Sequence, residues 1–338
     1  MSCRINLALQ GGGAHGAFTW GALDRLLDED AFEIAGISGT SAGALNAAAL
    51  KAGLVTGGRD GARAALDALW TAVGSAGDFR FAPWMRPFWP YAADLSEIAE
   101  NLFPISPAGI AAQLVSPYDW NGLWSNPLAH VVASLDFDAI AARHGPKIFI
   151  GATDVRTGKP EIFSGRRVTP EAILASACLP TAFRAVEIDG RAFWDGGFSG
   201  NPALFPLYEP DLPDDILIIQ VNPLRREAVP TSPVDIQNRI TEISFNAPLL
   251  AEMRAIRFVR RLIASGALQR GTMKEIRLHL ISDDKLMNDL SGTTKMLPSP
   301  ALLGRLRQAG RAAADRFLDR HGKKLGEAQS LDIAEVLD

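Results

Sequence analysis

The sequence predicts an α/β fold in three layers, an α/β/α arrangement with helices on both faces of a central sheet. Short apolar runs typical of strands alternate along the chain with longer segments of helical period, and two strand-to-helix junctions are rich in glycine. We expect strands at 4–10, 34–38, 147–154, 191–195 and 215–222, and helices at 14–28, 42–53 and 170–178. Ligands of such sheets bind beyond the carboxyl ends of the strands, so chemistry-bearing residues are expected there.

Composition is that of a globular protein with a large core. The chain has 338 residues, 47% of them hydrophobic and 21% charged, and a net charge of −4 that argues against a nucleic-acid partner. Cys3 and Cys178 are too few for a disulfide framework. The N-terminus does not read as a signal peptide, and no apolar stretch is long enough to cross a membrane. We therefore expect a cytoplasmic protein, with peripheral contact to a membrane as a further hypothesis.

Ser41 carries the strongest chemical signal. Gly39-Thr40-Ser41-Ala42-Gly43 fits the G-x-S-x-G pattern and lies between a predicted strand and a predicted helix. In this pattern the small neighbours permit a turn so tight that the serine hydroxyl stands exposed at a helix N-terminus. Free N–H groups there favour a developing negative charge. The alternative is an ordinary strand-to-helix turn.

A glycine loop, Gly11-Gly12-Gly13-Ala14-His15-Gly16, follows the first predicted strand and precedes a helical pattern. Its backbone N–H groups could bind a phosphate or the oxyanion of a tetrahedral intermediate. The spelling also fits G-x-G-x-x-G, but a dinucleotide site needs an acid at the end of the second strand. Asp30 and Glu33 precede that strand, which counts against the dinucleotide alternative.

Asp195 follows an alternating apolar run and precedes Gly196 and Gly197, then Asn201-Pro202. This is the pattern of an acid held at the end of a strand. Taken alone, Asp-Gly is also a common turn signal, and at Asp189-Gly190 we predict a simple hairpin turn.

The three motifs in this order resemble the patatin-like phospholipase family over about residues 4–223. The resemblance implies a Ser-Asp dyad without histidine, with Ser41 as the nucleophile and Asp195 as the base. It implies an oxyanion hole from the backbone of Gly11, Gly12, Gly13 and Ala42. The remaining motif glycines are Gly16, Gly39, Gly43, Gly196 and Gly197. It implies neither a metal nor a cofactor.

The chain departs from this family at two positions. The family often has an acidic residue before the glycine loop and a Lys or Arg inside it, whereas this chain has Gln10 and His15. A fixed positive charge in the loop is thus not expected, and His15 is assigned no catalytic role.

A Ser-Asp-His triad in α/β-hydrolase order is the alternative mechanism. It would need a histidine after Asp195, and only His279 and His321 follow. His279 alternates with apolar residues in a predicted strand at 275–282, and His321 lies in a basic run. The nucleophile of α/β-hydrolases also follows several strands, whereas Ser41 follows the second.

We predict a catalytic domain over 1–223 and a mainly helical extension over 224–338 that packs on it. Residues 70–130 hold five of the seven tryptophans, mixed with proline, and are interpreted as a lid or cap over an acyl pocket. The alternative is an irregular insertion with a small core of its own. In the extension, helices are expected near 254–263 and at 300–320. The first carries a cationic stripe of Arg254, Arg257 and Arg261, which could meet anionic lipid head groups or simply be solvated.

The function predicted from these residues is hydrolysis of an acyl ester of a phospholipid or related lipid. The same dyad would serve an acyltransferase or a thioesterase, because an acyl-enzyme can be released to any acceptor that enters. A nucleotide-binding or scaffold protein with a non-catalytic glycine loop is the alternative from another class.

Overall fold

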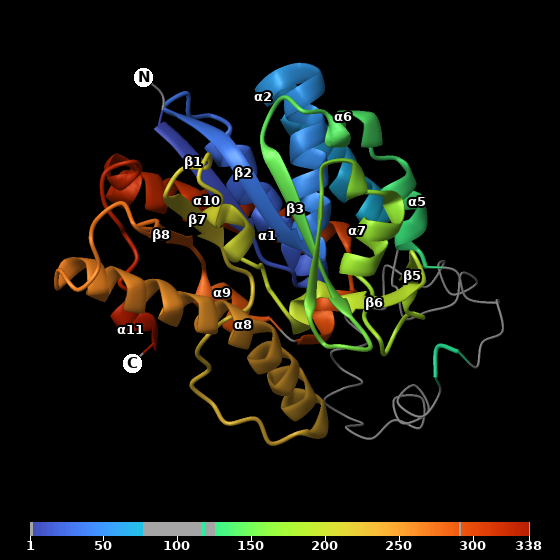
Figure 1. Cartoon of the computed structure of the whole chain (residues 1–338). Coiled ribbons are helices and arrows are strands. Elements are labelled where there is room, and N and C mark those ends of the chain that lie inside the picture. Colours follow the sequence, from blue (N-terminus) through green and yellow to red (C-terminus); the bar gives the residue numbers. More distant parts are fainter. Residues whose placement is uncertain (1–2, 77–115, 119–125, 291, 338) are drawn as a thin grey trace.

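The computed structural model describes residues 3–76, 116–118, 126–290 and 292–337. One sheet of eight strands forms its centre, in the order β5-β6-β3-β2-β1-β7-β8 with β4 paired to β3. Its strands are β1 (Cys3–Leu9), β2 (Phe32–Thr40), β3 (Lys147–Asp154), β4 (Pro160–Ser164), β5 (Val186–Ile188), β6 (Arg191–Asp195), β7 (Asp215–Ile219) and β8 (Arg277–Ile281). The strands from β3 to β8 along this order are parallel, whereas β4, β5 and β6 form an antiparallel end (Figure 1).

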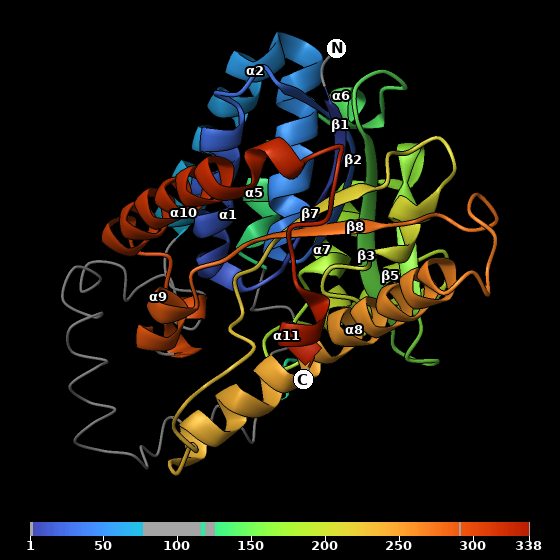
Figure 2. The same cartoon turned by 90° about the vertical axis from the view of Figure 1, so that its left-hand side faces the viewer.

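Helices cover both faces of the sheet, which confirms the three-layer prediction. The α-helices are α1 (Gly16–Leu26), α2 (Ala42–Ala76), α5 (Leu128–Ala133), α6 (Phe137–Ala141), α7 (Pro170–Ser176), α8 (Pro233–Ala264), α9 (Asp284–Asp289), α10 (Pro300–His321) and α11 (Ile333–Leu337). Short 3₁₀ helices are η1 (Gly13–His15), η3 (Gly165–Arg167), η4 (Gly196–Phe198), η5 (Phe205–Tyr208), η6 (Gly292–Met296) and η7 (Gly322–Lys324). Figure 2 shows α1, α2 and α10 on one side of the sheet and α8 and α11 on the other.

The central strands are apolar on both faces because each face packs on helices. In β7, Leu217 and Ile219 belong to the core beneath α1, α2 and α10, whereas Ile216 and Ile218 belong to the core beneath α8. Such strands therefore lack the polar alternation of a sheet with one wet face. Burial on both sides fixes the register, because a slip of one residue would exchange the two side-chain sets.

Most predicted elements are confirmed, but α2 is longer than predicted, and the short helices α5, α6, α9 and α11 were not predicted. The helix predicted at 42–53 runs on to Ala76 and is interrupted at Gly57 and Gly58, where Gly58 has a φ of +61°. Strands β4 and β5 were not predicted as separate elements. Asp189 and Gly190, with φ of 51° and 73°, form the predicted hairpin turn between β5 and β6.

The C-terminal extension supplies an outer strand as well as helices. β8 lies parallel to β7 at the edge of the sheet, as Figure 1 shows. In α8, Ile256 and Ile263 are buried, whereas Arg254 and Arg261 are exposed, so the predicted amphipathic helix is present. The division at residue 223 stays a prediction.

Most of the predicted lid lies outside the described residues, including Trp84, Trp89, Trp120 and Trp124. Trp70, at its start, is a core residue of α2. Its side chain is 2% exposed, and its indole stacks on Trp20 at a centroid distance of 6.5 Å.

Candidate active site

Ser41 occupies a sharp turn between β2 and α2. Its φ of +56° is in the left-handed region, which is unusual for a residue with a side chain and is retained only where the surroundings hold it. The neighbouring glycines make the turn sterically feasible. A Cβ on Gly39 would lie 2.4 Å from the carbonyl oxygen of Gly43, and one on Gly43 would lie 2.0 Å from that of Leu9. Close packing of backbone on backbone therefore explains both glycines of the motif.

Ser176 holds the backbone of this turn. The N–H of Ser41 donates to Ser176 Oγ at 2.9 Å, and the Ser176 hydroxyl donates to the carbonyl of Gly151 at 2.6 Å. Ser176 thus links the turn to strand β3. This role was not predicted, since a serine at the end of a short helix carries no distinctive sequence pattern.

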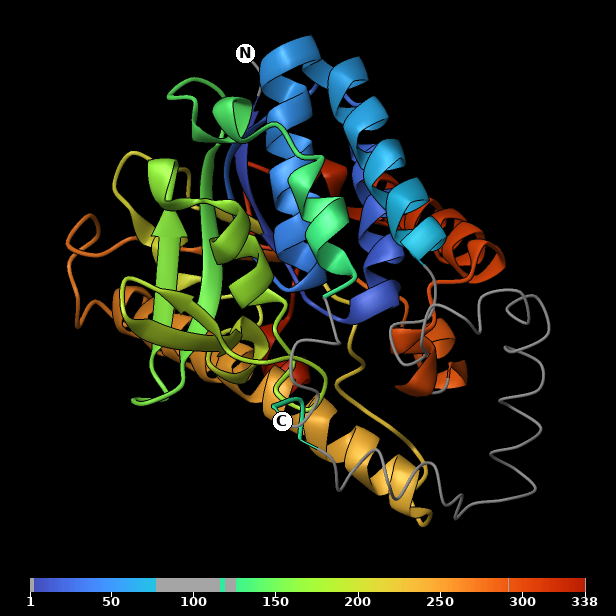
Figure 3. The same ribbon diagram turned by 90° about the vertical axis from the view of Figure 1, so that its right-hand side faces the viewer.

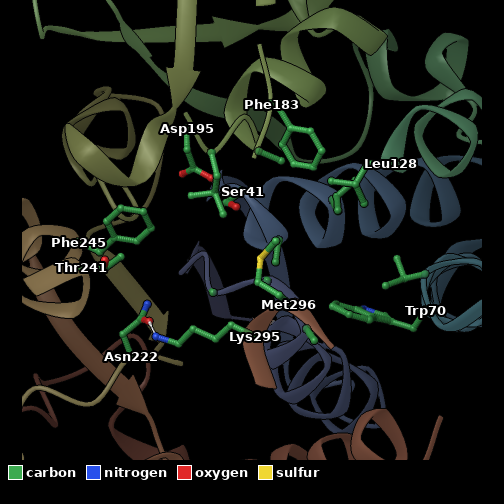
Figure 4. Close-up of a pocket in the computed structure, with 18 residues that line it drawn as sticks. Ser41, Trp70, Leu128, Phe183, Asp195, Asn222, Thr241, Phe245, Lys295 and Met296 are labelled. Atoms are coloured by element: carbon green, nitrogen blue, oxygen red, sulfur yellow. Dashed lines mark hydrogen bonds between the residues drawn. The ribbon is translucent and has the colours of Figure 1, made fainter. Parts of the chain in front are cut away.

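Asp195 ends β6 and is brought to Ser41 by strand pairing. Thr40 pairs with Gly151 across β2 and β3, and the next residue of β3, Ala152, pairs with Asp195. Because β6 is antiparallel to β3, its last residue lies near the carboxyl end of β2, where Ser41 begins α2. Figure 4 shows the Asp195 carboxylate directed toward Ser41.

The Asp195 carboxyl group is fully buried. Its Oδ1 accepts the N–H of Gly197 at 2.8 Å. No group in the described part of the chain donates a hydrogen bond of normal geometry to its Oδ2. Burial raises the pKa of this carboxyl to about 7, against the lowering effects of the Gly197 N–H and the Ser41 hydroxyl. At neutral pH Asp195 is therefore a much stronger base than an ordinary aspartate.

The glycine loop lies against Ser41. A Cβ on Gly11 would approach Ser41 Cβ to 2.7 Å, and one on Gly16 would approach Ala42 Cβ to 2.6 Å. The N–H of Gly11 donates to Asn201 Oδ1 at 2.7 Å, so this N–H is occupied in the structure. Gly12 precedes the short helix η1, which Gly13 begins, and Ala42 begins α2. N–H groups at such positions have no partner within their own helix.

Gln10 orients the loop through its side-chain amide. Its Oε1 accepts the N–H groups of Val221 and Asn222, both at 2.8 Å, and its Nε2 donates to Asn246 at 2.9 Å. A carboxylate at this position could not make the last bond, because it has no donor. This explains why a glutamine serves here in place of an acid.

His15 is buried and uncharged. Burial lowers its pKa to about 3, and the positive charge of Lys295 acts in the same direction. Its Nε2 lies 2.7 Å from Thr294 Oγ1, a contact with η6. The glycine loop itself therefore brings no positive charge to the site.

His279 is held away from the serine by partners of its own. Its Nε2 lies 3.0 Å from Asp215 Oδ1 and its Nδ1 lies 2.8 Å from Ser330 Oγ. Both ring nitrogens are thus occupied. Neither His279 nor His321 lines the pocket that contains Ser41, which counts against the triad alternative.

Ser41 and Asp195 open into a mainly apolar pocket of about 110 Å³. Its wall comes from the glycine loop, α2, α5, the turn after α7, α8 and η6, and includes Leu45, Trp70, Val73, Leu128, Leu179, Phe183, Phe245 and Met296 (Figure 4). An apolar wall with a few polar groups at one end is typical of a site for a ligand with a long apolar part. Lys295 is the only basic side chain among the lining residues that the structure describes.

Gly196 and Gly197 are required by close packing. A Cβ on Gly196 would lie 2.2 Å from the Gly151 carbonyl oxygen, and one on Gly197 would lie 2.7 Å from the Phe245 ring. Phe245 belongs to α8, so the extension packs on the Asp195 motif.

Within the described ranges, no group of three or more His, Cys, Asp or Glu side chains could hold a metal ion. No helix in those ranges is both long enough and apolar enough to span a bilayer. Cys3 and Cys178 are both free thiols.

Two solved structures match this chain at low identity. VipD from Legionella pneumophila is 14% identical with a TM-score of 0.42, and the match covers 94% of this chain and 67% of VipD. The heterodimeric ExoU–SpcU complex from the type III secretion system of Pseudomonas aeruginosa gives 17% identity and a TM-score of 0.31, covering 99% of this chain and 75% of that one.

A comparison with curated protein sequences gives no match. The family model described as patatin-like phospholipase matches residues 7–208, which is more than half of the chain and includes the glycine loop, Ser41 and Asp195. The chain therefore belongs to the patatin-like phospholipase family of lipid hydrolases.

Proposed function

We propose that this chain is a serine lipid acyl hydrolase that cleaves an acyl ester of a phospholipid or related lipid. Ser41 is the nucleophile in this proposal and Asp195 its base. The observation that carries it is the buried Asp195 carboxylate, which faces Ser41 at the end of an apolar pocket.

Asp195 would first act as a general base. Its Oδ2, which has no complete hydrogen bond, takes the proton of the Ser41 hydroxyl as Ser41 Oγ attacks the ester carbonyl carbon. The carbonyl becomes an oxyanion, and collapse of this intermediate expels the alcohol, which takes the proton back from Asp195. Asp195 then takes a proton from water, which attacks the acyl-enzyme. As the second oxyanion collapses, Ser41 Oγ leaves and takes this proton from Asp195, which releases the fatty acid and restores the dyad.

The oxyanion would be bound by backbone N–H groups at two helix starts. Gly12 and Gly13 come from the glycine loop and Ala42 from the start of α2, and all three line the pocket beside Ser41. Since Gly11 donates its N–H to Asn201, we assign Gly11 a supporting role beside the oxyanion hole. Loss of one such donor typically costs about a hundredfold or more in rate.

We also propose that the N-terminal half of α8 contacts a lipid surface. Ile236, Ile240 and Ile243 are 42%, 51% and 54% exposed, although large aliphatic side chains are usually buried. Thr241 and Phe245 of the same helix line the pocket. This half of α8 extends beyond the rest of the described structure, as Figure 3 shows. Contact there would place the pocket next to the acyl chains it takes.

The test compares wild type with Ser41→Ala and Asp195→Asn. We expect wild type to hydrolyse p-nitrophenyl esters and phospholipids and to react with a fluorophosphonate at Ser41. Both variants should fold, judged by circular dichroism, and lose activity by several orders of magnitude. Full activity in chelator would agree with a metal-free dyad. Identification of the acyl product as free acid, in the presence of an added alcohol or thiol, separates hydrolysis from acyl transfer.

A well-folded Asp195→Asn variant that kept wild-type activity would refute the dyad. A wild type that neither reacts with the fluorophosphonate nor cleaves any ester would favour the nucleotide-binding or scaffold alternative.

A further inference from the structure

A cluster of unlike charges lies beside the polar end of the pocket. Glu242 of α8 is 1% exposed and forms ion pairs with Arg226 at 2.7 Å, with Arg239 at 3.3 Å and with Lys295 at 3.5 Å. Three cations thus surround one buried carboxylate. The cluster carries excess positive charge when all four groups are ionised, and burial of such an excess favours an anionic ligand.

Lys295 is the member of this cluster that reaches the pocket. Its backbone packs on the glycine loop so closely that a Cβ on Gly13 would lie 2.2 Å from the Lys295 carbonyl oxygen. Its Nζ donates to Asn222 Oδ1 at 2.8 Å, as Figure 4 shows. The Nδ2 of Asn222 in turn donates to the carbonyl of Gly11 at 2.7 Å. The ammonium group is therefore held in a fixed relation to the loop proposed to bind the oxyanion.

The ammonium group retains capacity for a ligand. A lysine has three N–H donors, and the described contacts of Lys295 are with Asn222 and Glu242. The side chain is 19% exposed, and it lines the same pocket as Ser41. Arg226 does not line the pocket, and it is tied to both oxygens of Glu242 at 2.9 and 2.7 Å, which leaves Lys295 as the group facing the ligand.

We propose that Lys295 binds the phosphate of a glycerophospholipid substrate and so selects phospholipids over neutral acylglycerols. This inference rests on the proposed function and deepens it. Lys295 lies outside the segment that matches the family, residues 7–208, and the loop histidine His15 is uncharged. The C-terminal extension thus supplies the cation that the glycine loop lacks.

The chemistry of the substrate agrees with this placement. A glycerophospholipid carries its phosphate a short glycerol backbone away from the scissile ester. Lys295 and Asn222 line the same pocket as Ser41 and the glycine loop, so with the ester carbonyl at that loop the proposal puts the phosphate at Lys295. A hydrogen bond from an ammonium group to a phosphate is among the stronger polar contacts in proteins.

The test compares monomeric dihexanoylphosphatidylglycerol with dihexanoylglycerol as substrates. For Lys295→Met we expect kcat/KM to fall about tenfold to hundredfold on the phospholipid, mainly through KM, and to stay within about twofold on the neutral lipid. Lys295→Arg should restore most of the preference. Lys285→Met, which removes an exposed lysine of α9 outside the pocket, is the matched control and should behave as wild type.

Equal losses on both lipids would refute the proposal and make Lys295 a structural support of the glycine loop. Unchanged kinetics on both would also refute it. Inorganic phosphate that inhibits p-nitrophenyl butyrate hydrolysis through Lys295, without any phospholipid preference, would refute the headgroup assignment in favour of a free-phosphate site. Labelling of Ser41 by a fluorophosphonate in Lys295→Met separates these results from failure of the hydrolase proposal.

Discussion

Asp195→Asn should stabilise the protein at alkaline pH while it removes the proposed base. When the pKa of a carboxyl is higher in the folded than in the unfolded state, ionisation of that carboxyl lowers the free energy of unfolding. Its pKa is 3.8 in a model compound and about 7 in the folded protein. Below pH 3.8 both states are protonated and no stability is lost. As the pH rises from 3.8 to 7, the unfolded state gives up its proton first, so stability falls, and above pH 7 the loss is constant.

The size of the effect follows from the difference between the two pKa values. About three pKa units correspond to about 4 kcal/mol of stability lost above pH 7, at 1.36 kcal/mol per unit. Between pH 5 and pH 8 the loss amounts to about 2.5 kcal/mol. An asparagine has the same shape, keeps an oxygen for the Gly197 N–H, and does not titrate. The stability difference between wild type and Asp195→Asn should therefore grow by about 2.5 kcal/mol over this range.

Urea unfolding at several pH values, followed by circular dichroism, measures this difference. Other titrating groups act equally in both proteins and cancel, including His15. Ser41→Ala serves as the control, because it keeps the carboxyl and should lose stability with pH at least as steeply as wild type. A difference between wild type and Asp195→Asn that did not change with pH would refute the raised pKa. The wild-type kcat/KM should rise with pH around 7 for the same reason.

Two further predictions concern the turn at Ser41 and the exposed face of α8. Ser176→Ala removes the acceptor of the buried Ser41 N–H, so we expect about 1–3 kcal/mol of destabilisation and a lower kcat. The control is Ser164→Ala, at an exposed serine. A Ser176→Ala variant with wild-type stability and kcat would contradict the role given to the Ser176 hydroxyl. Ile240→Asp should weaken sedimentation with anionic lipid vesicles about tenfold, because burying an isoleucine side chain in lipid is worth about 1.5–3 kcal/mol. The control is Met273→Asp, which changes an apolar side chain of equal exposure, 51%, and should bind as wild type. Equal losses in both variants would refute a specific lipid-facing surface.

The sequence predicted the central part of the fold because local signals agree there. Strands such as β1 and β7 are short apolar runs bounded by glycine, proline or polar residues, and α10 has a clear helical period from Pro300. β4 and the continuation of α2 to Ala76 were missed. The interruption at Gly57-Gly58 has the local pattern of a helix end, but α2 resumes after it, with Leu66 and Trp70 buried in the core.

The sequence by itself was enough to predict roles for Ser41, the glycine loop and Asp195, because glycines adjacent in sequence mark each of these three motifs. The tertiary structure alone decided which side chains support them. Ser176 meets Ser41 over 135 positions of chain, Asn201 meets Gly11 over 190, and Lys295 meets Asn222 over 73. These contacts depend on the order of strands in the sheet and on the return of the C-terminal extension over the glycine loop. Single serines, asparagines and lysines carry no local pattern, so only the packing of distant segments gives them their roles.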